Sequence, residues 1–221
     1  MVTSCFYVVQ PNFQQHTDTA TPSFHLPLNP INRRYFNVRT AIVIQQTRTW
    51  LKTVVIDHTI CPFAKREYDR NSIRYCVSDT IDTAECLTSL IEACQHLDTD
   101  PDYETTLVIL AEGFKDFDDF LTLIDIAEKL LIKQGYEGIY QLASFHPDYS
   151  FANAPRNDPA NYTNRSPYPM LHILREASIE AILKNHPNPE NIPERNIAYT
   201  RQLGISAVQK LLADCFKPDA S

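Results

Sequence analysis

Apolar residues recur at two different spacings along the middle of this chain. Residues 72–78 alternate, with Ile73, Tyr75 and Val77 on one face, which is typical of a β-strand. Residues 106–111 are an unbroken apolar run, as expected of a strand that is covered on both faces, and residues 139–145 predict a third strand. The pattern therefore predicts three strands separated by longer segments.

Those longer segments carry apolar residues three and four positions apart, which predicts helices. One such pattern begins at Ala41 and ends near Asp57. A second follows Asp82, which with Glu85 resembles a capping box, and a third follows Asp116. Gly135 stands where a left-handed helix end is expected.

Residues 166–181 are also expected to form a helix. Ser166 can cap it, Pro167 and Pro169 are tolerated in a first turn, and its last part has a regular apolar face. A further helix is predicted after Gly204. The pattern along the whole chain therefore predicts an α/β fold. We expect a small, mostly parallel β-sheet of β-α-β-α-β order flanked by helices, with additional N- and C-terminal helices.

The domain organisation is predicted to be simple. Residues 1–38 hold scattered Pro, Gln, Thr and Asn without a sustained period, and we expect them to be a flexible N-terminal extension. Residues 39–217 are expected to form one globular α/β domain, because 221 residues of which 43% are hydrophobic suffice for one well-filled core.

Charge narrows the range of partners. The chain carries 27 acidic and 20 basic residues, for a net charge of −7, and has no block of Lys and Arg, so nucleic acid is not an expected partner. No apolar stretch is long enough for a membrane span, and no signal peptide is recognised. The six cysteines form no CxxC pair, which fits reduced thiols in the cytoplasm.

Two His-containing stretches, SFHPDY and TNRSPYPMLHILRE, hold most of the candidate chemistry. In a parallel sheet His146 follows the carboxyl end of the third strand, where ligands usually bind. His172, Arg175 and Glu176 would share one side of the helix predicted over residues 166–181. A site built from both stretches would combine imidazole, carboxylate and guanidinium groups.

Two chemistries fit that combination, and a structural network of ion pairs and hydrogen bonds is the alternative to both. In the first, Arg165 and Arg175 hold a small anionic, even phosphorylated, molecule while His146 or His172, with Glu176, transfers a proton. In the second, a divalent metal is bound by two imidazoles and carboxylates. Its ligands would come from His146, Asp148, His172 and Glu176.

Four further residues extend this candidate site. Asn164 precedes the predicted helix start, where amides can form an anion nest. Cys61 could be the N-cap of a short helix beginning at Pro62, and there helix amides and Lys65 would favour the thiolate, a nucleophile. The alternative for Cys61 is a buried residue at a helix junction. Arg74 either faces solvent or adds a positive group to the same pocket.

Six segments of the chain resemble, in order, the blocks of the domain-of-unknown-function family 1415, which consists mainly of bacterial proteins. They are WLKTVVIDHTICPFAK, IRYCVSDT, ETTLVIL, GIYQLASFHPDYSF, NYTNRSPYPMLHILREASIE and IPERNI, and the resemblance covers about residues 43–210. It implies a single compact domain and supplies no reaction. Family members often have Asn-Leu before CPFA, where this chain has Thr59-Ile60. The resemblance therefore transfers no role to any of the candidate residues.

The sequence thus leads to three functional hypotheses. The first is an enzyme acting on a small anionic substrate, the second a metal-binding enzyme, and the third a non-catalytic module that binds a ligand or a partner protein.

Overall fold

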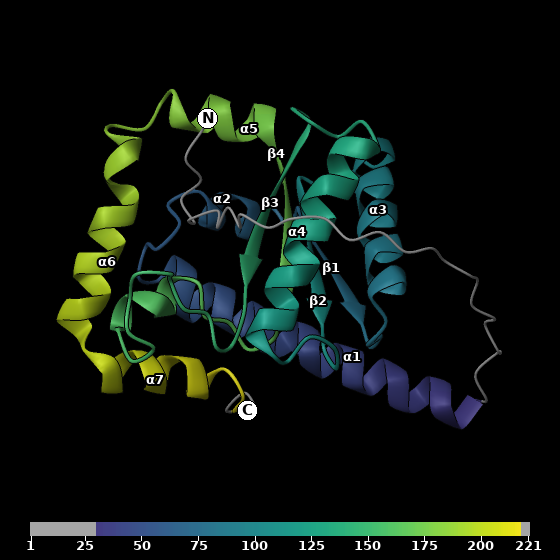
Figure 1. Ribbon diagram of the computed structural model, residues 1–221, viewed down its shortest axis with the longest axis horizontal. Helices are drawn as coiled ribbons and strands as arrows, with labels where there is room; N and C mark the ends of the chain where they lie inside the picture. The colour runs from purple at the N-terminus through teal and green to yellow at the C-terminus, as the bar shows by residue number, and fades with distance from the viewer. Residues whose placement is uncertain (1–29, 218–221) are drawn as a thin grey trace.

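The computed structural model describes residues 30–217, and their side chains from residue 38 onward (Figure 1). The strands are β1 (Ile73–Ser78), β2 (Thr105–Leu110), β3 (Tyr140–Phe145) and β4 (Met170–Arg175). The longer helices are α1 (Pro30–Trp50), α3 (Thr83–Thr99), α4 (Phe117–Lys133), α6 (Ile192–Leu203) and α7 (Ile205–Asp214). The shorter helical segments are the π-helix η1 (Leu51–Ile56), α2 (Ala64–Asp69), the 3₁₀ turns η2 (Pro159–Thr163) and η3 (Pro189–Asn191), and α5 (Glu176–Leu183).

The sheet is mixed, and the expectation of a mostly parallel sheet was wrong. Its strand order is β1-β2-β4-β3. β1 pairs with β2 in parallel, whereas β4 runs antiparallel to both of its neighbours. The mixed arrangement arises because residues 170–175, which were expected to be helical, form the strand that lies between β2 and β3.

Local chemistry explains why this segment is a strand. Proline disfavours the helical conformation of the residue before it, so Pro167 and Pro169 keep Ser166 and Tyr168 extended. The apolar residues that follow are covered on both faces, as an inner strand requires. Leu171 and Ile173 enter one core, and Met170 enters the other.

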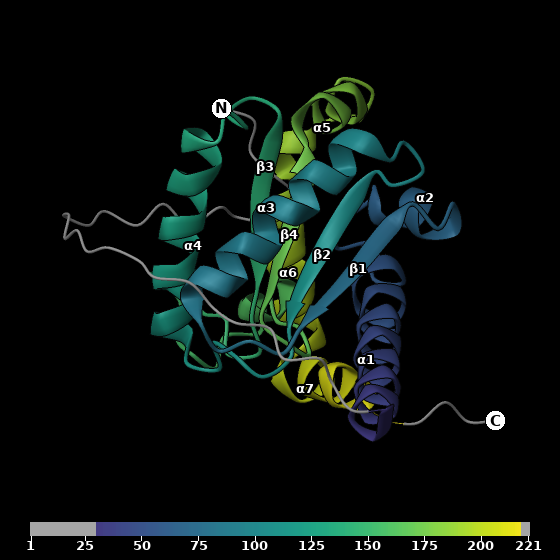
Figure 2. The ribbon, with the colours of Figure 1, turned by 90° about the vertical axis from the view of Figure 1, so that its right-hand side faces the viewer.

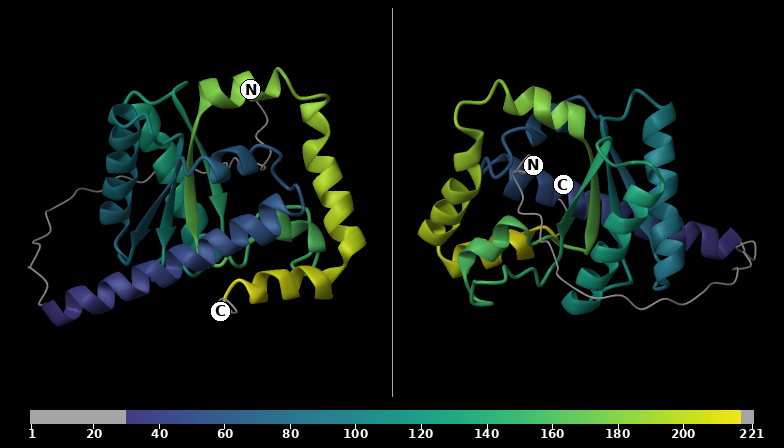
Figure 3. Two further views of the ribbon diagram at one scale, coloured as in Figure 1. Left: turned by 180° about the vertical axis from the view of Figure 1, so that it is seen from behind. Right: turned by 45° about the horizontal axis from the view of Figure 1, so that its top comes forward.

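Helices cover both faces of the sheet (Figure 2). α3 and α4 pack on one face around Val108, Leu110 and Phe120. α1 and η1 pack on the other, where Trp50 is 1% exposed and contacts Phe145 edge to face at 5.0 Å between ring centroids. Seen from behind, α1 runs obliquely past the strands, with α2 above it and α5 along the top (Figure 3, left).

The helix boundaries confirm several sequence predictions. The Asp82 carboxylate accepts a hydrogen bond from the Glu85 amide at 2.9 Å, and the Asp116 carboxylate accepts from two amides at the start of α4. Gly135 follows α4 with a φ of +83°, the left-handed conformation that glycine adopts readily. The residues at these helix ends thus predict where α3 and α4 begin and where α4 ends.

The first described residues extend the predicted first helix. Residues 30–38, assigned above to the flexible extension, belong to α1, and residues 1–29 lie outside the described residues. Within residues 30–217 no helix is both long and apolar enough to cross a membrane.

Candidate ligand-binding pocket

A pocket of about 100 Å³ lies between η1, α2, α5 and one face of the sheet. We call it the α2–α5 pocket. It sits at the carboxyl end of β4, beside Leu174, and at the amino end of β2, beside Thr105. Its lining combines many apolar side chains with a few polar ones. The lining residues are Trp50, Leu51, Val55, Cys61, Phe63, Ala64, Glu67, Ile73, Glu104, Thr105, Leu107, Phe145, His172, Leu174, Arg175, Ser178, Ile179 and Ile182.

Two of the three helical walls of this pocket, η1 and α5, are unusual in different ways. η1 is a π-helix, a rare conformation that occurs frequently at functional sites, and its Leu51 and Val55 are buried against the sheet. α5 has no buried residue, although Ile179 and Ile182 line the pocket. One wall is therefore fixed in the core, while the other is held by few contacts.

His172, on β4, is one of the polar residues of this lining. Its Nε2 lies 2.7 Å from the hydroxyl of Thr105, and that hydroxyl donates its only hydrogen to the carbonyl of Ile173 at 2.5 Å. The Thr105 oxygen must therefore accept from His172, which places the imidazole hydrogen on Nε2. Nδ1 is then an acceptor, and this buried atom has no hydrogen-bond partner among the described residues.

Burial also fixes the charge of this imidazole. It lowers the pKa of His172 from 6.5 to about 4, because the protonated ring loses more hydration than the neutral ring. At neutral pH His172 therefore presents an uncharged ring with one unused acceptor.

Two carboxylates also belong to the polar part of the lining. Glu67, on α2, is 9% exposed, and its Oε2 accepts from the Ser72 hydroxyl at 2.5 Å. Glu104, just before β2, has a buried Oε1 with no hydrogen-bond partner among the described residues. An unsatisfied buried acceptor costs about 1–3 kcal/mol. The pocket thus holds two such acceptors, one on His172 and one on Glu104.

Cys61 lines the same pocket, but not as a helix cap. The expectation of a helix beginning at Pro62 was wrong, because α2 begins at Ala64 and its N-cap is Phe63. The loop before α2 is held by α6, where Asn196 donates to the Ile60 carbonyl at 2.7 Å and Arg195 donates to the Thr59 carbonyl. Tertiary hydrogen bonds, rather than a helix terminus, therefore position this cysteine.

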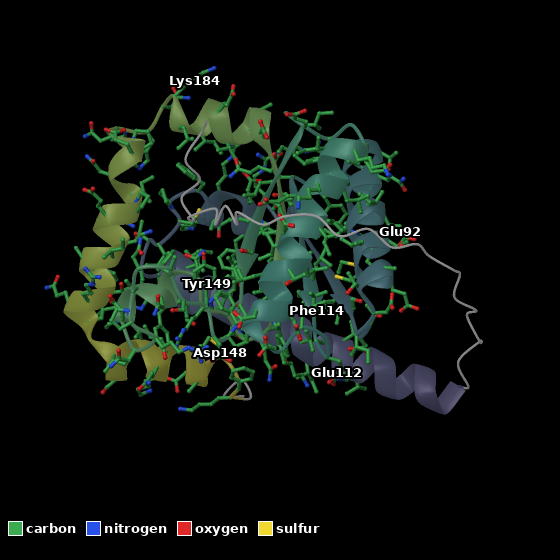
Figure 4. All side chains as sticks on the ribbon, viewed as in Figure 1. Glu92, Glu112, Phe114, Asp148, Tyr149 and Lys184 are labelled. Carbon is green, nitrogen blue, oxygen red and sulfur yellow. The ribbon has the colours of Figure 1, made fainter. Side chains whose placement is uncertain are left out.

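His146 lies at the other end of the sheet and is fully buried. Its Nε2 donates to the Phe114 carbonyl at 3.0 Å, and its Nδ1 accepts from the Asp148 amide at 3.0 Å. Burial lowers its pKa below 6.5, although the Phe114 contact opposes that shift. In Figure 4, Asp148, Phe114 and Glu112 are all labelled in the lower half of the view, with Lys184 at the top. Both ring nitrogens of His146 therefore serve the fold.

The guanidinium groups expected to clamp an anion are also engaged by the protein. Arg165 donates to the carbonyls of Tyr149 and Arg156 and lies 4.5 Å from the ring centroid of Tyr162. Arg175 donates to the Tyr140 hydroxyl and to the Leu97 carbonyl. These contacts tie loops and strand ends together.

The remaining candidates are dispersed. Asn164 is 1% exposed and donates to the Ser144 carbonyl near His146. Lys65 is exposed and pairs with Asp69, while Asp148 is also exposed. Glu176 begins α5, and Arg74 lies on the edge strand β1.

A metal centre finds no ready set of ligands here. Among the side chains that the structure describes, no group of three or more His, Cys, Asp or Glu residues is placed to hold a metal ion. His172 and Glu176 lie on a strand and on the helix after it, so they are not one helical turn apart as expected. The structure thus brings Cys61, His172 and Arg175 to one pocket and places His146, Asn164 and Arg165 elsewhere.

Comparison with known proteins gives one match. The family model described as "Protein of unknown function (DUF1415)" matches residues 42–210. The chain belongs to this family. No curated protein and no solved structure matches it. Every residue that lines the α2–α5 pocket falls inside the DUF1415 match, so the pocket is built entirely by the family's domain.

Sequence reasoning missed four polar residues of this DUF1415 pocket: Glu67, Glu104, Thr105 and Ser178. Glu104 and Thr105 open the ETTLVIL segment, where two polar residues before a buried strand are a usable signal. Glu67 lies in a short polar helix, and nothing in AKREYD distinguishes the buried carboxylate from the exposed ones.

Proposed function

We propose that this protein binds a small molecule with a mainly apolar body and a hydrogen-bond donor in the α2–α5 pocket. The observation that carries the proposal is the unused Nδ1 acceptor of His172 within an otherwise largely apolar lining. Small-molecule sites commonly have this composition, with apolar walls for affinity and a few polar groups for orientation. The bound donor relieves the cost of the unpaired nitrogen.

The size of the pocket indicates a small ligand. An apolar protein cavity of roughly 150 Å³ binds benzene. The α2–α5 pocket, at about 100 Å³, is of the same order, so a ring or a short branched chain sets the scale.

Movement of α5 gives such a ligand access. The Nδ1 atom of His172 is buried, so a donor reaches it only when a neighbouring wall shifts. α5 is the wall with no buried residue, and segments with little buried apolar surface open at low cost. We therefore include displacement of Ile179 and Ile182 in the proposed binding step.

Phenol and toluene test this proposal, because they share a ring and differ in the donor. We expect phenol to bind the wild-type protein more tightly than toluene, by roughly 10-fold for one hydrogen bond to a buried acceptor. Titrations followed by ¹H–¹⁵N NMR measure both affinities. Failure of both probes to bind, or equal affinities for the two, would contradict the proposal.

A substitution of His172 tests whether its Nδ1 accepts the hydrogen bond that the phenol hydroxyl donates. His172→Phe keeps an aromatic ring without the acceptor, and we expect it to abolish the preference for phenol. His96→Phe is the matched control, because His96 lies on α3 and does not line the pocket. The control variant should keep the wild-type preference.

Catalysis in the same pocket is a second candidate function, favoured by Cys61 and His172 lying in one lining. Cys61 would act as the nucleophile, and the neutral His172 ring, which burial makes a weak base, would pass the thiol proton on to water through Nδ1. Alkylation by iodoacetamide tests this pairing, since the sulfur forms a thioether, iodide leaves, and the thiol proton passes to a base. If His172 is that base, His172→Phe slows alkylation of Cys61 at pH 7 by about 10-fold or more. An unchanged rate would exclude His172 from that role.

The earlier hypothesis of an anionic substrate has less support at this pocket. Arg165 is absent from its lining, the Arg175 guanidinium is engaged by the protein's own oxygens, and Glu67 and Glu104 add negative charge. Benzoate is therefore included among the probes as the anionic counterpart. Binding of benzoate in preference to phenol would restore the anionic class.

A further inference from the structure

The chemical class of the ligand follows from which atoms of the pocket lack partners. Two polar atoms of the lining, His172 Nδ1 and Glu104 Oε1, lack a partner within the part of the chain that the structure describes; both are acceptors, and one belongs to a carboxylate. A ligand that satisfies both must bring more than one hydrogen, which a single hydroxyl group does not. This step rests on the proposed function, since it describes the occupant of the same pocket.

Charge around the pocket favours a cation. Glu67 is the second carboxylate of the lining and is itself 9% exposed. Its Oε1 pairs at 3.3 Å with Arg66, whose side chain is 61% exposed, and an ion pair to so exposed a partner contributes little. The pocket wall therefore retains negative charge on two side chains.

The positive group of the lining does not cancel this charge by direct contact. Arg175 directs its guanidinium to the Leu97 carbonyl and the Tyr140 hydroxyl. Among the described side chains, no ion pair joins it to Glu104 or to Glu67. Neutral hydrogen-bond donors would satisfy the acceptors, but only a cation would also offset the charge.

We infer that the occupant of the α2–α5 pocket is a small primary amine, bound in its protonated form. Its ammonium group carries three N–H donors, which suffice for Glu104 Oε1 and His172 Nδ1 with one to spare. Its apolar body lies against Phe63, Leu107 and Ile179. Charge-assisted hydrogen bonds of this kind are about twice as strong as neutral ones.

Three probes with one ring separate the classes: benzylamine, benzyl alcohol and benzoate. At pH 7 we expect benzylamine to bind wild-type protein about 10-fold or more tightly than benzyl alcohol, and benzoate to bind least. Isothermal titration calorimetry measures the three affinities. Equal binding of the amine and the alcohol would overturn the inference and leave the proposed function standing. Binding of none of the three, together with failure of phenol, would overturn both.

Glu104→Gln tests whether the Glu104 carboxylate is the group that binds the positive charge of the amine. This substitution keeps the shape and one acceptor but removes the charge, so the advantage of benzylamine over benzyl alcohol should fall to about twofold or less. Glu92→Gln is the matched control, because Glu92 lies on α3, outside the pocket lining (Figure 4). It should leave the advantage unchanged. A full advantage in Glu104→Gln would exclude Glu104 as the partner of the amine and overturn the inference.

Discussion

Thr105 and His172 hold each other across the β2–β4 pairing, with His172 Nε2 donating to the Thr105 hydroxyl at 2.7 Å. Thr105→Val keeps the volume but removes that hydroxyl, so Nε2 and the Ile173 carbonyl lose a partner. We expect a loss of about 1–3 kcal/mol in the free energy of unfolding, measured by urea denaturation.

Thr106→Val is the control for this substitution. The Thr106 hydroxyl is buried and lacks a hydrogen-bond partner among the described residues, so its removal leaves no group unpaired. We expect Thr106→Val to be neutral or stabilising. A stability loss equal to that of Thr105→Val would show that the Thr105 hydrogen bonds contribute nothing specific.

His172 should make stability depend on pH. Its pKa is about 4 in the folded protein against 6.5 as the ordinary value, so between these values the unfolded chain binds a proton that the folded chain does not. The free energy of unfolding is therefore not reduced by His172 above pH 6.5, and it decreases as the pH falls towards 4. The lost stability amounts to roughly 3 kcal/mol over that window.

His172→Phe removes this dependence, which makes it measurable as a difference. Chemical denaturation at pH 7.5 and at pH 4 gives the free energy of unfolding of both proteins. We expect the wild type to lose more stability than the variant over this interval. Parallel losses in the two proteins would place the proton uptake elsewhere.

His146 is predicted to stabilise the fold without contributing to binding. His146→Phe leaves the Phe114 carbonyl and the Asp148 amide without their imidazole partners, and we expect a cost of about 2–4 kcal/mol. Phenol affinity at 20 °C should not change, because the α2–α5 pocket does not include this residue. Reduced phenol affinity at unchanged stability would assign His146 to a ligand site instead.

Gly113 and Gly135 are required for different reasons. A Cβ at Gly113 would lie 2.4 Å from the Thr80 carbonyl oxygen, whereas one at Gly135 meets nothing within 4 Å but has a φ of +83°. Overpacking costs about 1–3 kcal/mol and left-handed strain about 1–2 kcal/mol, so alanine should destabilise the protein at either position.

Asparagine separates the two causes, since it tolerates the left-handed conformation better than alanine does. Gly135→Asn should therefore cost less stability than Gly135→Ala, while Gly113→Asn should cost at least as much as Gly113→Ala. Thermal unfolding of the four variants gives this comparison. The reverse order at Gly113 would mean that the Thr80 loop moves away readily.

Occupancy of the pocket should protect Cys61 from modification. Saturating phenol is expected to slow alkylation of Cys61 by iodoacetamide by roughly fivefold or more, because the ligand fills the space through which the reagent arrives. Peptide mapping by mass spectrometry distinguishes the cysteines. Cys76 is partly exposed and lies outside the pocket lining, so its rate should not respond to phenol.

The sequence predicted those parts of the fold that local chemistry decides. Asp82, Asp116 and Gly135 mark helix ends because each satisfies or permits a specific backbone geometry there. Residues 170–175 were misread because an apolar run after two prolines fits a helix start as well as an extended strand. This segment is a strand because it pairs with β2 and β3, and that pairing depends on contacts between residues far apart in the sequence.

For the candidate site, too, the sequence predicted what depends on residue type and not what depends on tertiary contacts. Cys61 and His172 were recognised by residue type and do share a pocket, but His146 is occupied on both nitrogens by backbone groups that no local pattern reveals. Glu67 was missed because burial of a carboxylate is a tertiary property, whereas Glu104 precedes a buried strand and its position there was a usable signal. Residue chemistry could be read from the sequence, whereas the partners that each residue has, or lacks, could not.

The position of β4 also bears on how the protein is made. β2 and β3 leave the ribosome before the strand that joins them, and neither can complete its pairing until residues 170–175 follow. Nascent chains that stop short of β4 therefore expose two unmatched strand edges, which are open to pairing with other chains. Cooperative folding of the sheet, and with it the binding pocket, is a late event of synthesis, and truncation before β4 should yield aggregation rather than a smaller folded domain.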